Sequence, residues 1–380
     1  MVPGAVKVDD CIFGMAGGPV LVCAVMSDEP SLGPGSAPVT VPLRVRARRV
    51  APFVIAAVAM AWVLRSVLGL PPQPDKVQAL VEVFRHVPYG RFLAASVALL
   101  WLNCAADSLA MFYTFRWFGC RLPYRELFII RASTYLLAVV QYYVGQAAIL
   151  AFLHRRRGVP FVVATGWILF ISGINMGVLV LLAAVGLVGS DGAVPWLRAV
   201  PLAVGAGALV YGAILWRRPR QIADFRLLAP LFAAGVVGHL KATGVRLPHV
   251  LVLILWHYLS LRWFGVNVPF FTALVLLPAV FFAAALPISV QGLGLSQAAA
   301  VYFFSAYAPA GKTAVLAYSL AMTTVSLISQ IGMGLLFLPA GRRLGLESPP
   351  DDAAGQPAGE AAPDRAEAGS RGAAVGLVDG

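Results

Sequence analysis

Long, uninterrupted apolar runs dominate this 380-residue sequence and limit what it can fold into. A helix of about 20 apolar residues crosses roughly 30 Å of hydrocarbon. Only 12% of the residues are charged, whereas a soluble domain usually carries about 25%. Membrane β-strands would alternate apolar and polar residues, and these runs do not. We therefore predict an all-α polytopic membrane protein with about six full spans, at 51–70, 92–115, 160–188, 198–216, 247–264 and 313–338.

Two further apolar stretches, 126–153 and 268–308, are interrupted by glycine and polar residues. The first starts just after Arg121 and Arg125 and ends at three consecutive arginines, 155–157. Arginines favour the cytoplasmic side of a membrane, so a single crossing would leave one of these clusters outside. A re-entrant helical hairpin removes the conflict, provided that protein or water surrounds its irregular backbone. We predict that both stretches form such hairpins.

The basic clusters also orient the chain. Four arginines between positions 44 and 49 precede the first run, and Arg342 and Arg343 follow the last. By the positive-inside rule, both termini are cytoplasmic in a multi-pass protein of the cell (inner or plasma) membrane. The stretch 226–246 has a short apolar part and carries His239, Lys241 and Arg246, which predicts an interfacial cytoplasmic helix.

The two ends of the chain differ in composition from the region between them. Residues 1–42 are rich in glycine, proline and small residues, and residues 345–380 in alanine, glycine, proline and acid. Such compositions bury little apolar surface, so we expect both segments to be disordered and residues 43–344 to form the transmembrane domain. The apolar stretch 11–26 lacks a strongly basic leader, and we do not expect it to be a signal peptide.

The sequence contains an internal repeat. The string Arg-Trp-Phe-Gly-x-x-x-Pro-aromatic occurs at 116–124 before the first hairpin and at 262–270 before the second. Each hairpin then carries Gln-Ala-Ala, at 146–148 and at 297–299. Three predicted crossings separate the copies, so they would form an inverted repeat, with broken helices meeting near the bilayer midplane as in transporters. The alternative is a pair of similar interfacial anchors.

The most distinctive string is Pro-Ile-Ser-Val-Gln-Gly-Leu-Gly-Leu-Ser-Gln at 287–297. Its proline and glycines break a helix, and Ser289, Gln291, Ser296 and Gln297 offer neutral hydrogen-bonding groups. No strand precedes the Gly-Leu-Gly, so it is not a dinucleotide-binding loop. Two interpretations stay open, namely contact with a substrate and a structural turn whose polar groups satisfy one another.

This string resembles the C-terminal signature of the lysylphosphatidylglycerol synthase transmembrane-region family, the flippase-like domain proteins. The family pattern is Pro-Ile-Ser-x-x-Gly-x-Gly-x-Arg-Glu, which matches from Pro287 to Leu295. A second family element, Pro-Gly-x-x-Gly-Glu, is matched by Gly145 beside Gln146. With the span pattern, the resemblance covers roughly 45–343. It implies a membrane domain that moves lipids or serves as the membrane half of an aminoacyl-lipid synthase.

The chain departs from that family pattern at its charged positions. The two acidic positions are Gln146 and Gln297 here, and the arginine before the second is Ser296. If relatives bind a cation or a proton through those acids, this chain lacks that coupling. The soluble aminoacyl-transfer domain of the synthases is not expected in this chain.

Four polar residues inside the apolar runs are candidates for an ion pair or a packing contact. Asn103 and Asp107 are four positions apart, which places them on one helical face. Arg131 in the first hairpin is the natural partner of Asp107, because an intramembrane charge is usually paired or functional. Arg131 could form a structural pair with Asp107 or meet a lipid phosphate. His257, in the middle of a span, is expected to be a hydrogen-bonded packing residue.

These features favour a lipid translocase over an enzyme. The expected partner is a membrane phospholipid or lipid-linked substrate. Short basic clusters between spans account for the net charge of +12, so no nucleic acid is expected. The sequence has no nucleophile elbow and no metal-ligand spacing, so we expect no cofactor and no metal. The alternatives are a membrane subunit of a separate lipid-modifying enzyme and an inactive scaffold. Expected substrate-binding residues are Arg131, Gly145, Gln146, Ser289, Gln291, Gly292, Gly294 and Gln297.

Overall fold

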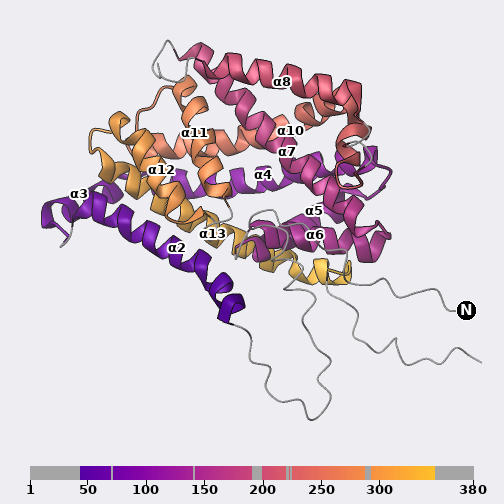
Figure 1. The fold of residues 1–380 in the computed structure, drawn as a ribbon. Coiled ribbons are helices and arrows are strands. Elements are labelled where there is room, and N and C mark those ends of the chain that lie inside the picture. The colour runs from indigo at the N-terminus through magenta and orange to yellow at the C-terminus, as the bar shows by residue number, and fades with distance from the viewer. Residues whose placement is uncertain are drawn as a thin grey trace, which may run out of the picture. The chain divides into compact units, whose positions relative to one another are not determined.

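The computed structural model describes residues 43–346 except 70–71, 140–141, 191–198, 220–221, 223–224 and 287–291. The predictions for 1–42, for 347–380, and for Ser289 and Gln291 therefore lie outside the described residues. Within them, every regular element is helical (Figure 1). The elements are α2 (Leu43–Leu68), α3 (Pro74–His86), α4 (Tyr89–Trp117), α5 (Tyr124–Ala138), α6 (Tyr142–Arg157), α7 (Phe161–Gly189), α8 (Val200–Arg217), α10 (Ala229–Trp263), α11 (Phe270–Ala285), α12 (Leu295–Phe304), the 3₁₀ helix η4 (Ser305–Tyr307) and α13 (Lys312–Arg343).

Four of the described helices are long and apolar enough to cross a membrane: α4, α7, α10 and α13. The predicted runs 51–70 and 198–216 form α2 and α8, whose described apolar parts, 56–68 and 202–217, are shorter than a full span. Helix content and apolar length together are those of an all-α membrane protein.

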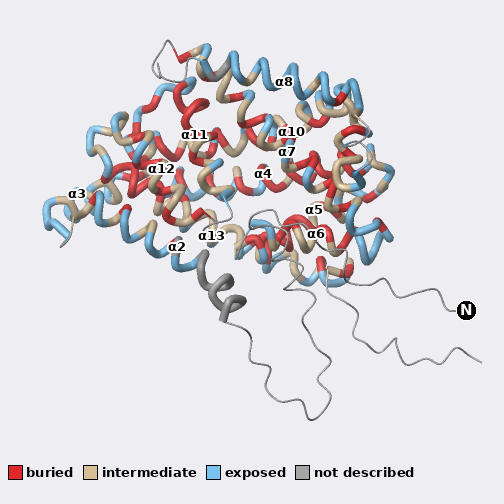
Figure 2. Tube along the Cα trace, in the orientation of Figure 1, coloured by how far each residue is buried: buried red, intermediate tan, exposed pale blue. Residues whose placement is uncertain are grey.

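The outer surface of the bundle is apolar. On α8, Leu202, Leu209 and Trp216 are 79%, 77% and 85% exposed, and Figure 2 shows most of this helix as exposed. Large exposed apolar areas are unusual on soluble proteins and mark surfaces that contact another apolar medium. The exterior of α8 therefore suits contact with lipid.

Both interrupted apolar stretches form helical hairpins. Helices α5 and α6 have 15 and 16 residues, or about 22–24 Å at 1.5 Å per residue, which is less than the roughly 30 Å of hydrocarbon. Arg157 Nη2 lies 2.5 Å from Glu126 Oε2, so the end of α6 returns to the start of α5. In the second hairpin the Asn267 amide donates to the Tyr307 carbonyl at 2.8 Å, which closes α11–α12 in the same way.

The repeated string has the same backbone conformation in both copies. Gly119 ends α4 with φ 87° and Gly265 ends α10 with φ 75°, the left-handed conformation that glycine adopts readily. Each glycine amide bonds the carbonyl three residues earlier, and the next amide bonds the carbonyl five residues earlier. These two bonds define a Schellman C-cap. The sequence repeat is therefore also a repeat of local structure.

Helices α4 and α10, which precede the two hairpins, pack antiparallel. Trp256 Nε1 donates to Ser96 Oγ at 3.0 Å. Asn103 Nδ2 donates to the His249 carbonyl at 3.2 Å, and His249 Nδ1 lies 3.2 Å from the Asn103 carbonyl. Asn103 and His249 are 146 positions apart, the same offset as between the repeated strings at 116 and 262. Equivalent positions of the two copies thus contact each other reciprocally.

The helices that follow the hairpins cross over to the other copy. Helix α7 follows the first hairpin and packs on α11 of the second, whereas α13 follows the second and packs on α5 of the first. Glycines permit both contacts. A Cβ on Gly186 would lie 2.7 Å from the Phe271 carbonyl oxygen, and one on Gly334 would lie 2.8 Å from the Leu136 amide nitrogen. Small residues allow helix backbones to approach closely in membranes.

The structure corrects the prediction for 226–246. Residues 236–246 do not form a separate interfacial helix but belong to one helix with the predicted span, which continues to Trp263. Gly235, with the non-helical angles φ 56° and ψ −173°, forms a kink that separates this helix from the short helical segment 229–234; glycine alone adopts this conformation at low cost. Lys241 and Arg246 are therefore carried by the same helix as the predicted span 247–264, and Arg246 is only 3% exposed.

Candidate functional site

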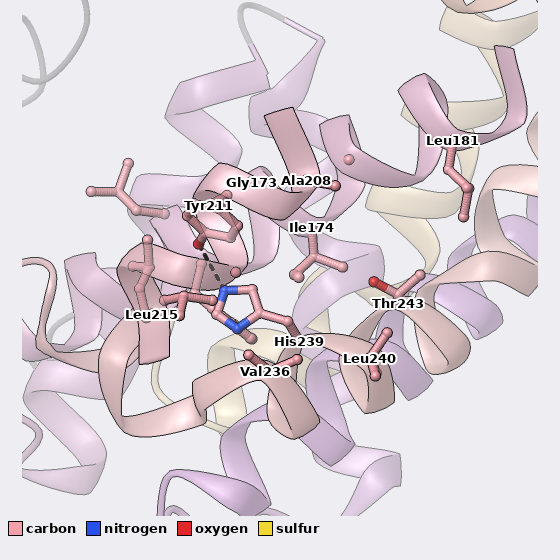
Figure 3. Close-up of a pocket in the computed structure, with 15 residues that line it drawn as sticks. Gly173, Ile174, Leu181, Ala208, Tyr211, Leu215, Val236, His239, Leu240 and Thr243 are labelled. Carbon is pink, nitrogen blue, oxygen red and sulfur yellow. Dashed lines mark hydrogen bonds between the residues drawn. The ribbon is translucent and has the colours of Figure 1, made fainter. Parts of the chain in front are cut away.

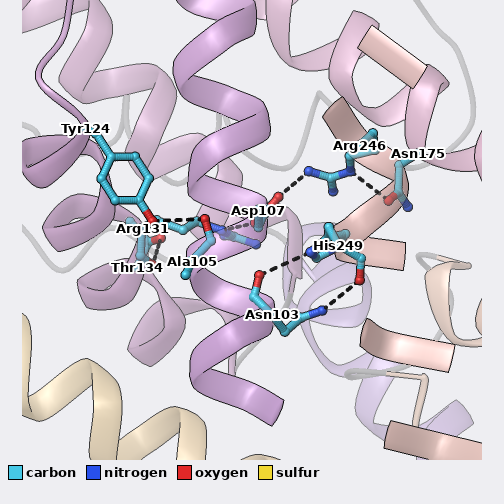
Figure 4. A network of polar contacts seen from close by, with 9 residues as sticks. All are labelled: Asn103, Ala105, Asp107, Tyr124, Arg131, Thr134, Asn175, Arg246 and His249. Atoms are coloured by element: carbon cyan, nitrogen blue, oxygen red, sulfur yellow. Dashed lines mark hydrogen bonds and ion pairs between the residues drawn. The ribbon is translucent and has the colours of Figure 1, made fainter. Parts of the chain in front are cut away.

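A buried cluster of three charges connects α4, α5 and α10 (Figure 4). Asp107 of α4 is completely buried, and Arg131 and Arg246 are 4% and 3% exposed. Arg131 Nε donates to Asp107 Oδ2 at 2.5 Å, and Arg246 Nη1 donates to Asp107 Oδ1. The predicted Asp107–Arg131 pair is therefore confirmed, and a second arginine completes a triad.

Neutral groups fix the orientation of this triad. Arg246 Nε donates to Asn175 Oδ1 of α7 at 3.0 Å, and the Arg131 guanidinium lies 4.9 Å from the centre of the Tyr135 ring, a distance typical of a cation–π contact. One helical turn from Asp107, the reciprocal Asn103–His249 bonds hold α4 against α10. The two arginines are thus positioned by contacts among four helices, α4, α5, α7 and α10.

The charges of this cluster do not cancel. Two guanidinium groups and one carboxylate sum to a net charge of +1, and the described residues classed as buried contain no other Asp, Glu, Lys or Arg. Arg131 Nη1 has no hydrogen-bond partner among the described residues. A buried donor without a partner costs about 1–3 kcal/mol, and more when it is charged. The cluster therefore has both the charge and a free donor to bind an anion.

Gln146, on α6 of the same hairpin as Arg131, is also incompletely bonded. It is 6% exposed, and its Oε1 has no partner among the described residues. Its neighbour Gly145 packs closely against α5, because a Cβ there would lie 3.1 Å from the Thr134 carbonyl oxygen. The first hairpin thus holds one buried donor and one buried acceptor that have no partner in the described chain.

The two hairpins meet. Tyr143, at the start of α6, donates through its Oη to the carbonyl of Ala285, the last residue of α11, at 3.0 Å. The start of α6 and the end of α11 are therefore neighbours. This contact does not place Gly145–Gln146 beside Gly292–Gln297, because Gly145 packs against α5 and Gly294 against α2. The approach of the two segments stays a prediction, and the two glutamines have separate hydrogen-bond surroundings.

Gln297 satisfies the backbone at the start of α12. Its Oε1 accepts from the Gly294 amide at 2.6 Å and from Ser296 Oγ at 3.1 Å, and its Nε2 donates to Thr323 Oγ1 of α13 at 2.9 Å. Gly292 and Gly294 have φ values of 72° and 83°. Of the two interpretations of this string, these contacts favour the structural turn for the described residues 292–297.

A cavity of about 170 Å³ lies beside this turn, between α10, α11, α12 and α13. His257 Nδ1 and Tyr318 Oη form a 2.7 Å hydrogen bond at its wall, which confirms His257 as a bonded packing residue. The remaining polar groups around the cavity are neutral: Ser296, Gln297, Ser319, Thr323, Ser326 and Gln330. This cavity can accept hydroxyl or ester groups by hydrogen bonding, and none of the side chains lining it is an Asp, Glu, Lys or Arg.

Comparison with known proteins gives no independent assignment, since no family model, curated protein or solved structure matches the chain. The described residues contain no group of three or more His, Cys, Asp or Glu side chains that could hold a metal ion. Sequence reasoning did not identify Arg246, Asn175 or Tyr143 as parts of the site. A charged residue two positions before a proline in α10 was the available signal for Arg246.

Proposed function

We propose that this protein is a lipid translocase, which moves a phospholipid or lipid-linked substrate with an anionic headgroup across the membrane. The buried Asp107–Arg131–Arg246 cluster, with its net positive charge and the free Nη1 of Arg131, is the observation that carries this proposal. An arginine inside a membrane is costly and is retained where it pairs or functions. A phosphate accepts strong charge-assisted hydrogen bonds from guanidinium and would complement the excess positive charge of the cluster.

An inverted repeat with two re-entrant hairpins would bring such a headgroup to the middle of the membrane. Antiparallel α4 and α10, the reciprocal Asn103–His249 contact and the exchanged packing of α7 and α13 support a pseudo-two-fold axis perpendicular to α4 and α10. If those helices cross the bilayer, this axis lies in the membrane plane, which is the arrangement of many transporters. In Figure 1 the two hairpins lie toward opposite sides of the view.

The proposed path connects the charged cluster with the neutral cavity. Tyr142 and Tyr143 are adjacent on α6, with ring centres 5.6 Å apart, and Tyr143 bonds Ala285. Ala284, the residue before it, lines the 170 Å³ cavity. In this proposal the phosphate binds at Arg131, and the neutral hydroxyls or esters of the headgroup enter the cavity, which Ser326 and Gln330 also line.

Translocation of a fluorescent phosphatidylglycerol in proteoliposomes tests the proposal. We expect wild-type protein to increase the rate and Arg131→Gln to abolish that increase, because the excess charge is removed while the neutral Asp107–Arg246 pair remains. Arg65→Gln, which changes an exposed arginine on α2, is the matched control and should retain the rate. Since Gln146 and Gln297 cannot release a proton, the rate should not change when a pH gradient is imposed.

The inactive scaffold remains the second candidate, because the polar groups of Gln297 are bonded within the protein. If the protein is a scaffold, wild-type and Arg131→Gln proteoliposomes should move the lipid no faster than empty vesicles. A change in a modified lipid on deletion of the protein, without transport by the purified chain, would instead favour the membrane subunit of a lipid-modifying enzyme.

A further inference from the structure

A groove of about 540 Å³ opens between α7, α8 and α10, away from the hairpins (Figure 3). Its volume lies within the range of about 300–1,000 Å³ that is typical of ligand pockets. The walls are almost entirely apolar, with aliphatic side chains from all three helices, among them Leu169, Ile174, Leu181, Ala208, Leu215 and Leu240. The groove could therefore hold a hydrocarbon chain.

Glycines create the space in this groove. Gly173 and Gly177 on α7 and Gly212 on α8 line it, and a Cβ added to any of the three would meet nothing within 4 Å. Glycine in a helix interior costs about 1 kcal/mol relative to alanine. Unlike Gly186, these glycines do not serve close helix packing, so their effect in the described structure is to leave the groove open.

One end of the groove is polar and basic. Tyr211 Oη and His239 Nε2 form a 2.8 Å hydrogen bond in the groove, and His239 Nδ1 lies 2.7 Å from the Gly235 carbonyl oxygen at the kink of α10. Arg218, the C-cap of α8, approaches the same kink, with its Nη2 3.9 Å from where a Cβ of Gly235 would lie. Leu215 and Val236 line this end of the groove; in the sequence, Leu215 is three residues from Arg218 and Val236 is next to Gly235.

We propose that this groove binds one acyl chain of an anionic phospholipid, with the lipid phosphate held at the Arg218 end. The apolar walls select a hydrocarbon chain, and the guanidinium at one end complements a phosphate. A lipid without net charge could fill the groove with its acyl chain but would gain no net charge attraction at Arg218. The site is separate from the Asp107 cluster and does not depend on the translocation proposal, since a bound lipid there would stabilise α8 against α7 and α10 even in a protein that moves no lipid.

Photo-crosslinking tests the site. The full chain is reconstituted into phosphatidylcholine vesicles that contain a minor share of phosphatidylglycerol with a diazirine on its acyl chain, and labelled peptides are identified by mass spectrometry. We expect labels on α7, α8 and α10 within the groove. Gly173→Leu should reduce this labelling about tenfold, which corresponds to excluding roughly two methylenes from the groove. Gly207→Leu, an equivalent change on α8 outside the groove lining, should leave it unchanged.

The headgroup part of the proposal has its own readout. Arg218→Gln should reduce the preference for labelled phosphatidylglycerol over labelled phosphatidylcholine roughly twofold to fivefold, the range expected for an exposed ion pair. Groove labelling that Gly173→Leu leaves intact would overturn the acyl-chain site. Equal labelling by the two lipids in the wild type would overturn the anionic headgroup. If Arg131→Gln abolishes transport and leaves the groove labelling unchanged, the groove site and the translocation site are independent.

Discussion

Replacing Asp107 by asparagine should destabilise the protein more than any other single change in the charged cluster. The substitution removes both ion pairs of a completely buried carboxylate and leaves two guanidinium groups, with a summed charge of +2, at 4% and 3% exposure. Removing one partner of a buried pair costs about 3–5 kcal/mol, and burial this deep leaves little solvent screening to reduce it. At 1.4 kcal/mol per factor of ten, the unfolded-to-folded ratio should rise by roughly two to three and a half orders of magnitude.

The net charge that each substitution leaves in the cluster predicts the order of stability of the other variants. Arg131→Gln leaves a neutral Asp107–Arg246 pair and should cost the least. Asp107→Asn with Arg131→Gln leaves one unpaired guanidinium and should be more stable than Asp107→Asn alone. Detergent-purified variants can be ranked by SDS-induced unfolding followed by tryptophan fluorescence, with Arg65→Gln as the control. If Asp107→Asn unfolds at the same SDS concentration as Arg131→Gln, or if the double variant shows the sum of the single losses, the charge argument is wrong.

Two further predictions concern topology and helix packing. The end of α6 and the segment after α13 should lie on the same side of the membrane, because Arg156 approaches Gly345. Cysteines placed at 156 and 345 should therefore react with an impermeant thiol reagent only from the cytoplasmic side, and labelling of either from outside intact cells would exclude the predicted orientation. Gly186→Ala should lower the thermal stability, since the added Cβ would lie 2.7 Å from a backbone oxygen of α11. Gly177→Ala on the same helix adds a Cβ that meets nothing within 4 Å, so it should raise the thermal stability slightly. Equal effects of the two substitutions would contradict the close approach of α7 and α11.

The apolar runs of the sequence were sufficient to locate the helices that must be apolar because they cross the membrane. Runs of apolar residues locate α4, α7 and α13 within a few residues of their observed bounds, because a span must be apolar over its whole length. The Asp107–Arg131 pair was also predictable, since each charge lies within an apolar segment and needs a partner. The caps at Gly119 and Gly265 follow from the repeated string, because local sequence determines local turns.

Contacts that depend on tertiary packing could not be predicted in this way. Lys241 and Arg246 lower the hydropathy of this part of α10, so their charges indicated an interface although the helix that carries them continues to Trp263. Arg246 enters the site only because α4 and α10 pack antiparallel, and Asn175 only because α7 lies beside them. Helical periodicity identifies which residues share a face, but it does not identify the helix that the face will contact.

Gln146 and Gln297, which the repeat presents as equivalent, should respond differently to substitution. The carboxamide of Gln297 bonds the Gly294 amide and Thr323 Oγ1, so Gln297→Ala removes the cap of α12 and should cost about 0.5–2 kcal/mol. In its protonated form, Glu at position 297 keeps an acceptor for the Gly294 amide and a donor for Thr323 Oγ1, so Gln297→Glu should fold and serves as the matched control. Gln146 Oε1 has no partner among the described residues; Gln146→Ala should therefore leave the SDS midpoint almost unchanged while slowing lipid translocation. Unfolding of Gln146→Ala, or normal stability of Gln297→Ala, would show that these assignments are reversed.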